Sequence, residues 1–272
     1  MKKKQMMHGL VLLLGMAFIS CSQETDLTPE DQTAHVRLNL NLDANADFGA
    51  STRAVTESEY RNVDNYDVVV LDKNGIEKLN CKAYEVESKM PITLPIGAYT
   101  VKAYYGNERA ASRNEFYVYG EEQGSIKADG THAVELICTP TCGRIAVTFE
   151  NGMSDYFSDY KVFFKGTEAL AGDSISWLRD DAEPWYVKLN EGGETVKFAI
   201  HAKTKDGFAN AANGMQEYIK TGQFTLNRNK AYKMNVTYTH TPTGEGGLKV
   251  EITIDEKTND KEVEIEVPVT WL

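Results

Sequence analysis

The segment LPIGAYTVKAYY (residues 94–105) carries the two signals that decide the fold of this chain. Its first four residues include a proline and a glycine, which predict a turn. The residues after the turn alternate between two faces, with Tyr99 and Val101 on one and Thr100 and Lys102 on the other. This period of two is typical of a strand that has one face in a core and the other in water.

The same alternation recurs along the chain, and turn signals separate the alternating segments. Further alternating segments are residues 36–42, 232–238, 250–254 and 263–267. Turn signals rich in glycine, asparagine and aspartate include residues 73–75, 128–130, 191–193, 205–207 and 244–247. Helical periodicity is limited to the short segments 57–60, 153–157 and 209–218. Many short strands with closely spaced turns predict an all-β fold made of antiparallel β-sandwiches.

An internal repeat in the sequence suggests that the sandwich occurs twice. Residues 95–105 form a glycine turn followed by a strand, and residues 125–138 resemble a hairpin around Asp129-Gly130. Residues 192–202 and 223–238 repeat that order, with the second hairpin centred on residues 227–229. We therefore expect two tandem β-sandwich domains, residues 34–140 and 141–272. Because the join near Thr139-Pro140-Thr141 is short, the domains should be closely coupled.

The N-terminal segment resembles a bacterial lipoprotein signal. Three lysines (residues 2–4) precede an apolar run at residues 10–19, which is too short to span a bilayer, and the run ends at Ser20-Cys21. Residues 1–20 would be removed and Cys21 lipidated, although Phe18 and Ile19 depart from the usual leucine-containing box. An ordinary cleaved secretion signal is the alternative.

Residues 21–33 are polar and acidic, and they predict a flexible tether between the lipid and the folded body. Residues 22–26 resemble the acidic segment of surface-exported lipoproteins from Bacteroides-type bacteria, although a plain solvated linker has the same composition. We expect a lipid anchor in the outer membrane, facing the cell surface or, alternatively, the periplasm.

Charge and cysteine usage restrict the partners further. Removal of residues 1–20 takes away three lysines and changes the formal net charge from −11 to −14, which argues against nucleic acid as a partner. The remaining cysteines are Cys81, Cys138 and Cys142. An extended Thr-Pro-Thr would hold the Cα atoms of the last two about 13 Å apart, so a disulfide requires this segment to fold back. Buried free thiols are the alternative, and the scattered histidines predict no metal site.

Several segments resemble the DUF4493 family, whose members are uncharacterised lipoproteins related to fimbrillin-like proteins. These segments are residues 94–101, 116–120, 156–160 and 263–268. The resemblance implies two transthyretin-like or immunoglobulin-like sandwiches with Greek-key connections, of the kind that build pili and surface adhesins. It also implies a protease cut after Arg53, which would free the preceding strand for replacement by a partner's strand. An exposed loop arginine is the alternative, and residues 263–272 would be either a donor strand or an ordinary final strand.

No catalytic motif is present in the sequence, so we expect a non-enzymatic protein without a cofactor. Asp180-Asp181 with Glu183 has the oxygen ligands that calcium prefers, but its spacing favours a solvated turn. Trp177, Trp185 and Tyr186 would form a ligand platform if they were exposed together, and would fill the core if they were not.

We therefore expect a cell-envelope lipoprotein that acts in cell adhesion or as a pilus-associated component. Its partners would be the membrane, through the lipid, and other pilus or adhesin subunits. The alternative is a glycan-binding surface lipoprotein of a polysaccharide-uptake system, which predicts exposed aromatic side chains. An enzyme with an unrecognised carboxylate site is a third hypothesis and predicts two carboxylates that converge in a cleft.

Overall fold

The computed structural model describes residues 32–46, 48, 57–150, 152–205, 217–240, 246–255 and 262–265, and it confirms that the chain is mostly β. The strands are β1 (Thr33–Ala44), β2 (Asp67–Asp72), β3 (Glu77–Lys82), β4 (Ile92–Pro95), β5 (Gly97–Tyr105), β6 (Ala111–Ser112), β7 (Val118–Ile126), β8 (Gly130–Pro140), β9 (Cys142–Phe149), β10 (Phe157–Lys165), β11 (Ile175–Leu178), β12 (Trp185–Lys188), β13 (Glu194–Thr204), β14 (Glu217–Leu226), β15 (Ala231–His240), β16 (Gly246–Asp255) and β17 (Glu262–Ile265). The helices among these residues are α1 (Glu57–Arg61), α2 (Val86–Lys89) and α3 (Met153–Tyr156), with 3-10 turns at Val63–Asn65 and Ala83–Glu85.

The N-terminal sandwich (β1–β5, β7 and β8) is one long sheet that turns a corner. The strand order is β3-β2-β5-β7-β8-β1-β4. At the corner, β7 and β8 pair only through Val118 with Pro140 and Tyr119 with Thr139. Buried side chains from both arms, such as Val70 and Val36, belong to one hydrophobic cluster. The arms β3-β2-β5-β7 and β8-β1-β4 therefore pack against each other as a sandwich.

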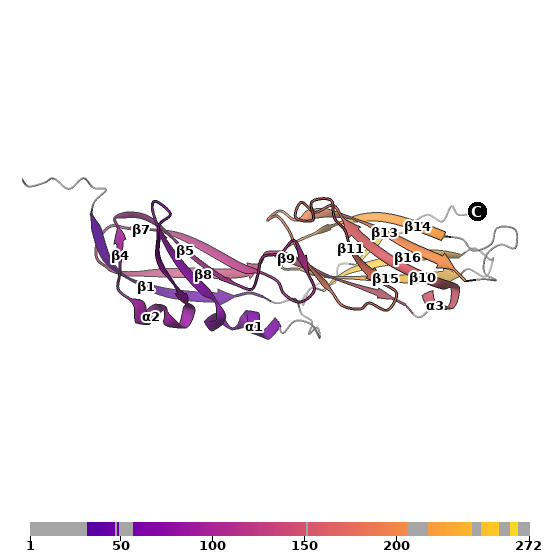
Figure 1. The fold of residues 1–272 in the computed structure, drawn as a ribbon, viewed down its shortest axis with the longest axis horizontal. Helices are drawn as coiled ribbons and strands as arrows, with labels where there is room; N and C mark the ends of the chain where they lie inside the picture. The colour runs from indigo at the N-terminus through magenta and orange to yellow at the C-terminus, as the bar shows by residue number, and fades with distance from the viewer. Residues whose placement is uncertain are drawn as a thin grey trace, which may run out of the picture.

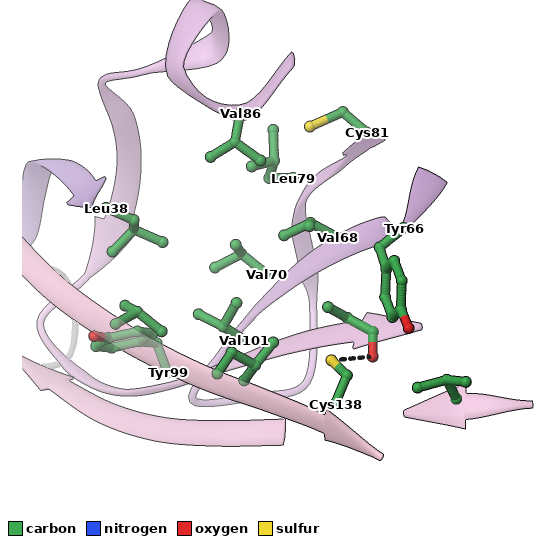
Figure 2. Packing of buried hydrophobic residues seen from close by; sticks show 14 of the residues in the cluster. Leu38, Tyr66, Val68, Val70, Leu79, Cys81, Val86, Tyr99, Val101 and Cys138 are labelled. Carbon is green, nitrogen blue, oxygen red and sulfur yellow. Dashed lines mark hydrogen bonds between the residues drawn. The ribbon is translucent and has the colours of Figure 1, made fainter. Parts of the chain in front are cut away.

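The core of this sandwich follows the alternation seen in the sequence. Tyr99, Val101 and Ala103 of β5 are 6%, 1% and 0% exposed, as expected for one face of a half-buried strand. Figure 2 shows Tyr99 and Val101 together with Leu38 of β1 and Val70 of β2 in this packed layer. At the edge of the layer, the Cys138 thiol donates a hydrogen bond to the Ala103 carbonyl at 3.5 Å.

The C-terminal sandwich consists of two separate sheets. One sheet has the order β11-β10-β13-β14, and the other has the order β17-β16-β15-β9-β12-β6. Their inner faces enclose a second hydrophobic cluster that includes Val162, Phe164, Trp177 and Ile200. Strand β6 comes from the connection between β5 and β7 of the N-terminal sandwich. It is nevertheless the edge strand of a sheet in the C-terminal sandwich.

The strand order repeats between the two sandwiches. The arm β3-β2-β5-β7 corresponds to β11-β10-β13-β14, and β8-β1-β4 corresponds to β15-β9-β12. In both sandwiches the first strand pairs in parallel with the strand that crosses back from the opposite sheet, β1 with β8 and β9 with β15. Both also place an aromatic ring directly opposite a glycine, Tyr99 opposite Gly124 and Phe198 opposite Gly222.

Two expectations about strand pairing were wrong. The segments around Asp129-Gly130 and residues 227–229 are not hairpins, because β7 and β8 diverge from that turn and β14 and β15 lie in different sheets. The sandwiches are also not purely antiparallel, as the two parallel pairs show. Side-chain alternation determines which face of a strand is buried, but it does not determine which strand pairs with it. Here each of the two turns carries the chain from one layer of the sandwich to the other.

The molecule is elongated, with the two sandwiches placed end to end (Figure 1). Strands β1–β5, β7 and β8 lie at one end, and most of β10–β16 lies at the other, with β9 starting at the junction. The short helices α1 and α3 form where helical periodicity was expected. The third segment expected to be helical is residues 209–218. Its last two residues, Glu217 and Tyr218, belong to strand β14, and residues 209–216 are outside the described ranges. Among the described residues, no helix is long and apolar enough to cross a membrane.

Candidate functional site

Strand β1 is the element that the strand-addition hypothesis requires to be removable. It pairs in parallel with β8 from Val36–Gly130 to Ala44–Cys138, and with β4 only over Thr33–Val36. Among the described strands, residues 37–44 therefore have a strand partner on one side only. Ala34, Val36 and Leu38 are at most 3% exposed, so the alternating apolar face of β1 forms part of the core.

The chain after β1 continues into the junction between the sandwiches. The Asn45 amide donates a hydrogen bond to the Cys138 carbonyl at 2.9 Å, and Ala46 is fully buried. The ring of Phe48, 1% exposed, lies 5.2 Å from that of Phe116 and 5.5 Å from that of Tyr186. Removing β1 would therefore also take side chains out of the junction. Arg53 lies outside the described residues.

A loop of the N-terminal sandwich closes the junction from the other side. Strand β6 pairs with β12 through Ala111 with Val187 and Ser112 with Tyr186. The Lys188 amide donates a hydrogen bond to the Ala110 carbonyl at 3.0 Å. These contacts are backbone pairings between residues that are more than seventy positions apart, so they fix the two sandwiches against each other.

Aromatic rings fill the space beneath this pairing. Phe116 stacks on Tyr186 of β12 at 4.9 Å and on Tyr60 of α1 at 3.8 Å between ring centroids. Tyr60 is also 5.0 Å from Tyr105 of β5. Both Phe116 and Tyr186 are buried. Stacked and tilted aromatic pairs of this kind add stability beyond the area that they bury.

Arg113, the residue after β6, reaches into the C-terminal sandwich. Its two terminal nitrogens donate to the two carboxylate oxygens of Asp181 at 2.7 and 2.5 Å. They also donate to the carbonyls of Glu183 at 2.9 Å and Ser176 at 2.8 Å. The guanidinium carbon lies 4.5 Å from the ring centroid of Trp185. A planar guanidinium satisfies a bidentate carboxylate and a stacked ring at the same time, which a lysine cannot do.

Of the two roles considered for Trp177, Trp185 and Tyr186, the structure favours packing in the core and junction over an exposed ligand platform. Trp177 and Tyr186 are 0% and 2% exposed, and the Trp177 indole donates to the Glu183 carbonyl at 2.9 Å. Trp185 is half-buried beneath Arg113, and its indole donates to the Ser176 carbonyl at 3.2 Å. These large rings pack in the core and the junction, where their volume fills the space between the sheets.

The acidic cluster also has a structural partner. Asp181 holds Arg113, and Asp180 pairs with Arg179 at 3.7 Å. Within the described part of the chain, no group of three or more histidine, cysteine, aspartate or glutamate side chains is arranged to hold a metal ion.

Comparison with known families decides the membership of the chain. The family model DUF4493, a domain of unknown function, matches residues 34–269. This chain belongs to the DUF4493 family. The family match covers the strands described above, apart from Thr33 at the start of β1, and it includes the junction.

Solved structures similar to this DUF4493 chain include two proteins of bacterial fimbriae. The fimbrial anchor protein Mfa2 from Porphyromonas gingivalis is 12% identical, with a TM-score of 0.42 over 86% of this chain and 99% of that chain. A fimbrial assembly protein from Parabacteroides distasonis is also 12% identical, with a TM-score of 0.42 over 86% of this chain and 98% of that chain. No curated protein matches the chain.

The three cysteines among the described residues of this DUF4493 chain are buried. Cys81, Cys138 and Cys142 form no disulfide. Burial, with a smaller contribution from Asp43, raises the pKa of the Cys138 thiol to about 12, so this thiol stays protonated at neutral pH. The proposed lipidation site, Cys21, lies outside the described residues.

An aromatic ladder that the sequence did not reveal lies on the outer face of the N-terminal sandwich. The ring centroids of Tyr104 and Tyr117 are 5.9 Å apart, and those of Tyr117 and Tyr119 are 6.1 Å apart. The Tyr119 hydroxyl donates to Glu121. Burial raises the pKa of Tyr117 to about 12, and burial together with Glu121 raises that of Tyr119. The i, i+2 spacing of Tyr117 and Tyr119 was the available signal, but the register that brings Tyr104 opposite Tyr119 was not visible in the sequence.

Proposed function

We propose that this protein is a non-enzymatic lipoprotein of the cell envelope that acts in cell adhesion or as a pilus-associated scaffold. The observation that carries the proposal is the junction, where β6, Arg113 and Phe116 tie two sandwiches into one elongated body. A stiff body of this kind suits a protein that presents a binding surface away from a membrane or transmits force between subunits. A catalytic role would instead require converging reactive groups.

We further propose that the body consists of two tandem domains, residues 34–140 and 141–272. The repeated strand order and the two hydrophobic clusters support this division. Cys142, Tyr186 and Ala231 join the first cluster although they belong to the second domain. The domains therefore share a packed interface, which suits coupled rather than independent movement.

The proposed lipid at Cys21 would place the C-terminal domain away from the membrane. The end of β1 lies beside Cys138 near the junction, so the start of β1 at Thr33 lies at the opposite end of the N-terminal domain. A tether of residues 21–33, when extended at ~3.3 Å per residue, spans about 40 Å. The C-terminal domain would then be the part that meets partners at the outer-membrane surface.

Strand exchange at β1 is the mechanism of assembly that we propose for a pilus role. A cut after Arg53 would leave β1 without a covalent link to the rest of the fold. The cut alone should not release it, because burying side chains such as Val36 and Leu38 stabilises the sandwich by about 1.5–3 kcal/mol each. Release would require a competing strand from another subunit, which would pair with β8 and fill the apolar positions of β1.

Limited proteolysis of residues 22–272 with a trypsin-like protease tests strand exchange. We expect selective cutting after Arg53, followed by loss of β1 and growth of oligomers at high protein concentration. Mass spectrometry would locate the cut, and size-exclusion chromatography would follow the product. The Arg53→Gln variant is the matched control and should stay uncut at this position and monomeric. Resistance at Arg53, or a cut product that remains monomeric, would overturn strand exchange and leave loop-mediated adhesion as the mode of action.

A further inference from the structure

The outer face of the sheet β11-β10-β13-β14 has a basic hollow that the proposed function does not use. Alternate residues of β10 and β13 point into the core, and their neighbours form this outer face. The hollow measures about 540 Å³. Its lining includes Phe163, Lys165, Ser174, Lys197, Thr221 and Gln223.

Two lysines of the hollow lie opposite each other, and no carboxylate among the described residues balances their charges. Lys165 of β10 lies directly opposite Lys197 of β13 in an antiparallel pair, where like charges destabilise a sheet. Both are exposed, and within the described part of the chain neither forms an ion pair and no carboxylate lines the hollow. After removal of residues 1–20 the formal charge of the chain is −14, so carboxylates are abundant elsewhere. A costly like-charge pair in an acidic protein points to an anionic ligand.

Four lysines elsewhere among the described residues do form ion pairs with a carboxylate. Lys78 and Lys82 pair with Asp72 and Asp67 at 3.1 and 2.9 Å. Lys102 and Lys188 pair with Glu121 and Glu108 at 3.4 and 2.9 Å. The two lysines of the hollow lack this pairing, and their charge is available to a bound anion.

The middle of the hollow offers an apolar surface beside hydrogen-bonding groups. Phe163 is half-buried and lies directly opposite Ala199, with the Lys161 ammonium 5.3 Å and the His201 ring 5.2 Å from its ring centroid. Ser174, Thr221 and Gln223, which carry hydroxyl and amide groups, also line the hollow. An aromatic face bordered by hydroxyl and amide groups suits a sugar ring, which presents C–H groups on its faces and hydroxyls at its edge.

We propose that this hollow binds an acidic polysaccharide that carries one carboxylate per sugar ring. Lys165 and Lys197 hold a carboxylate between them, and Phe163 contacts the face of an adjacent ring. A duplex nucleic acid fits less well, because its charge density of one per ~1.7 Å would meet only a few cations on an acidic body. An acidic peptide would lack backbone partners, because β10 and β13 are each paired on both sides. The proposal stands independently of strand exchange at β1.

Calorimetric titration of residues 22–272 with a short oligogalacturonate tests the proposal. We expect binding that weakens as salt is raised, and no binding of an uncharged galactose oligomer of the same length. The double variant Lys165→Gln/Lys197→Gln should weaken binding about tenfold or more, because it removes both charge-assisted contacts. The double variant Lys89→Gln/Lys127→Gln removes two exposed lysines from the N-terminal sandwich and should bind as the unchanged protein does.

The control variants separate a local site from a general charge effect. Because all four lysines are exposed, neither double variant should lower the melting temperature, and Lys165→Gln/Lys197→Gln should raise it slightly because it removes the like-charge pair. Three results would overturn the proposal: no binding of oligogalacturonate, equal loss in both double variants, or binding of polyglutamate or single-stranded DNA as tight as that of the oligosaccharide. Phe163→Ala gives a second readout, since a site with ring stacking loses affinity at high salt as well as at low salt.

Discussion

At the scale of single residues, Arg113 explains two features that the sequence left ambiguous. Asp181 and Glu183 had the composition of a calcium loop, and Trp185 had that of a ligand platform. In the structure the Asp181 carboxylate and the Glu183 carbonyl accept hydrogen bonds from the Arg113 guanidinium, which also lies over Trp185. The partner is about seventy residues away in the sequence, so no local pattern could have indicated it.

Tyrosine burial makes stability sensitive to alkaline pH. Tyr117 has its pKa raised by burial from the ordinary value of 10.0 to about 12, so its stabilising contribution is complete below pH 10 and is lost as the pH rises towards 12. We expect the melting temperature to fall across this window and to fall less steeply in Tyr117→Phe. Thermal unfolding at a series of pH values, with tyrosinate absorbance as the second probe, measures both.

Tyr84 supplies the control for that experiment. Its side chain is 65% exposed, so Tyr84→Phe should leave the alkaline slope unchanged. A slope that is the same in Tyr117→Phe and in the parent protein would show that Tyr117 ionises equally well in the folded state.

At the scale of strands, the pairing of an aromatic ring with a glycine recurs in both sandwiches. A Cβ atom on Gly222 would lie 2.4 Å from the Phe198 ring, and one on Gly124 would lie 2.4 Å from the Tyr99 ring. Each glycine therefore makes room for the ring that fills the core from the neighbouring strand. This pair of a ring and a glycine therefore repeats between the two sandwiches, as the strand order does.

Substitution of Gly222 tests how tightly this layer is packed. We expect Gly222→Ala to lower the free energy of unfolding by about 1–3 kcal/mol, because the new methyl group overlaps the Phe198 ring. Gly192→Ala, where a Cβ meets nothing within 4 Å, should change it by less than about 0.5 kcal/mol. Urea unfolding measures both changes. Equal stability of the two variants would mean that the Phe198 ring moves aside without cost.

Strands also show which parts of the fold the sequence could predict. Alternation identified the buried face of β5 because a period of two follows directly from strand geometry. It could not identify the parallel partner of β1 or the pairing of β6 with β12, because both depend on contacts between distant segments. The basic hollow was hidden for the same reason, since Lys165 and Lys197 become neighbours only through the register of β10 and β13.

At the scale of the whole molecule, the junction should make the two sandwiches unfold together. Backbone pairing of β6 with β12, the Arg113 contacts and the stacked rings of Phe116 and Tyr186 all cross between them. All three tryptophans, Trp177, Trp185 and Trp271, lie in the C-terminal half of the sequence. The fluorescence of Trp177 in β11 and Trp185 in β12 therefore reports on the C-terminal sandwich, whereas far-ultraviolet circular dichroism reports on both sandwiches.

We expect the urea transitions seen by the two probes to coincide in residues 22–272 and to separate in Arg113→Ala. The substitution leaves the carbonyls of Ser176 and Glu183 without this donor. It should lower the free energy of unfolding by about 2–4 kcal/mol, and the region around Trp185 should unfold first. The fluorescence midpoint should then move to lower urea than the dichroism midpoint. Arg109→Ala, which removes an exposed pair with Glu115, should leave both midpoints in place because such pairs contribute little. Separate transitions in the parent protein would show that the sandwiches are joined without being coupled, whereas coincident transitions in Arg113→Ala would assign the coupling to the aromatic stack and β6 instead.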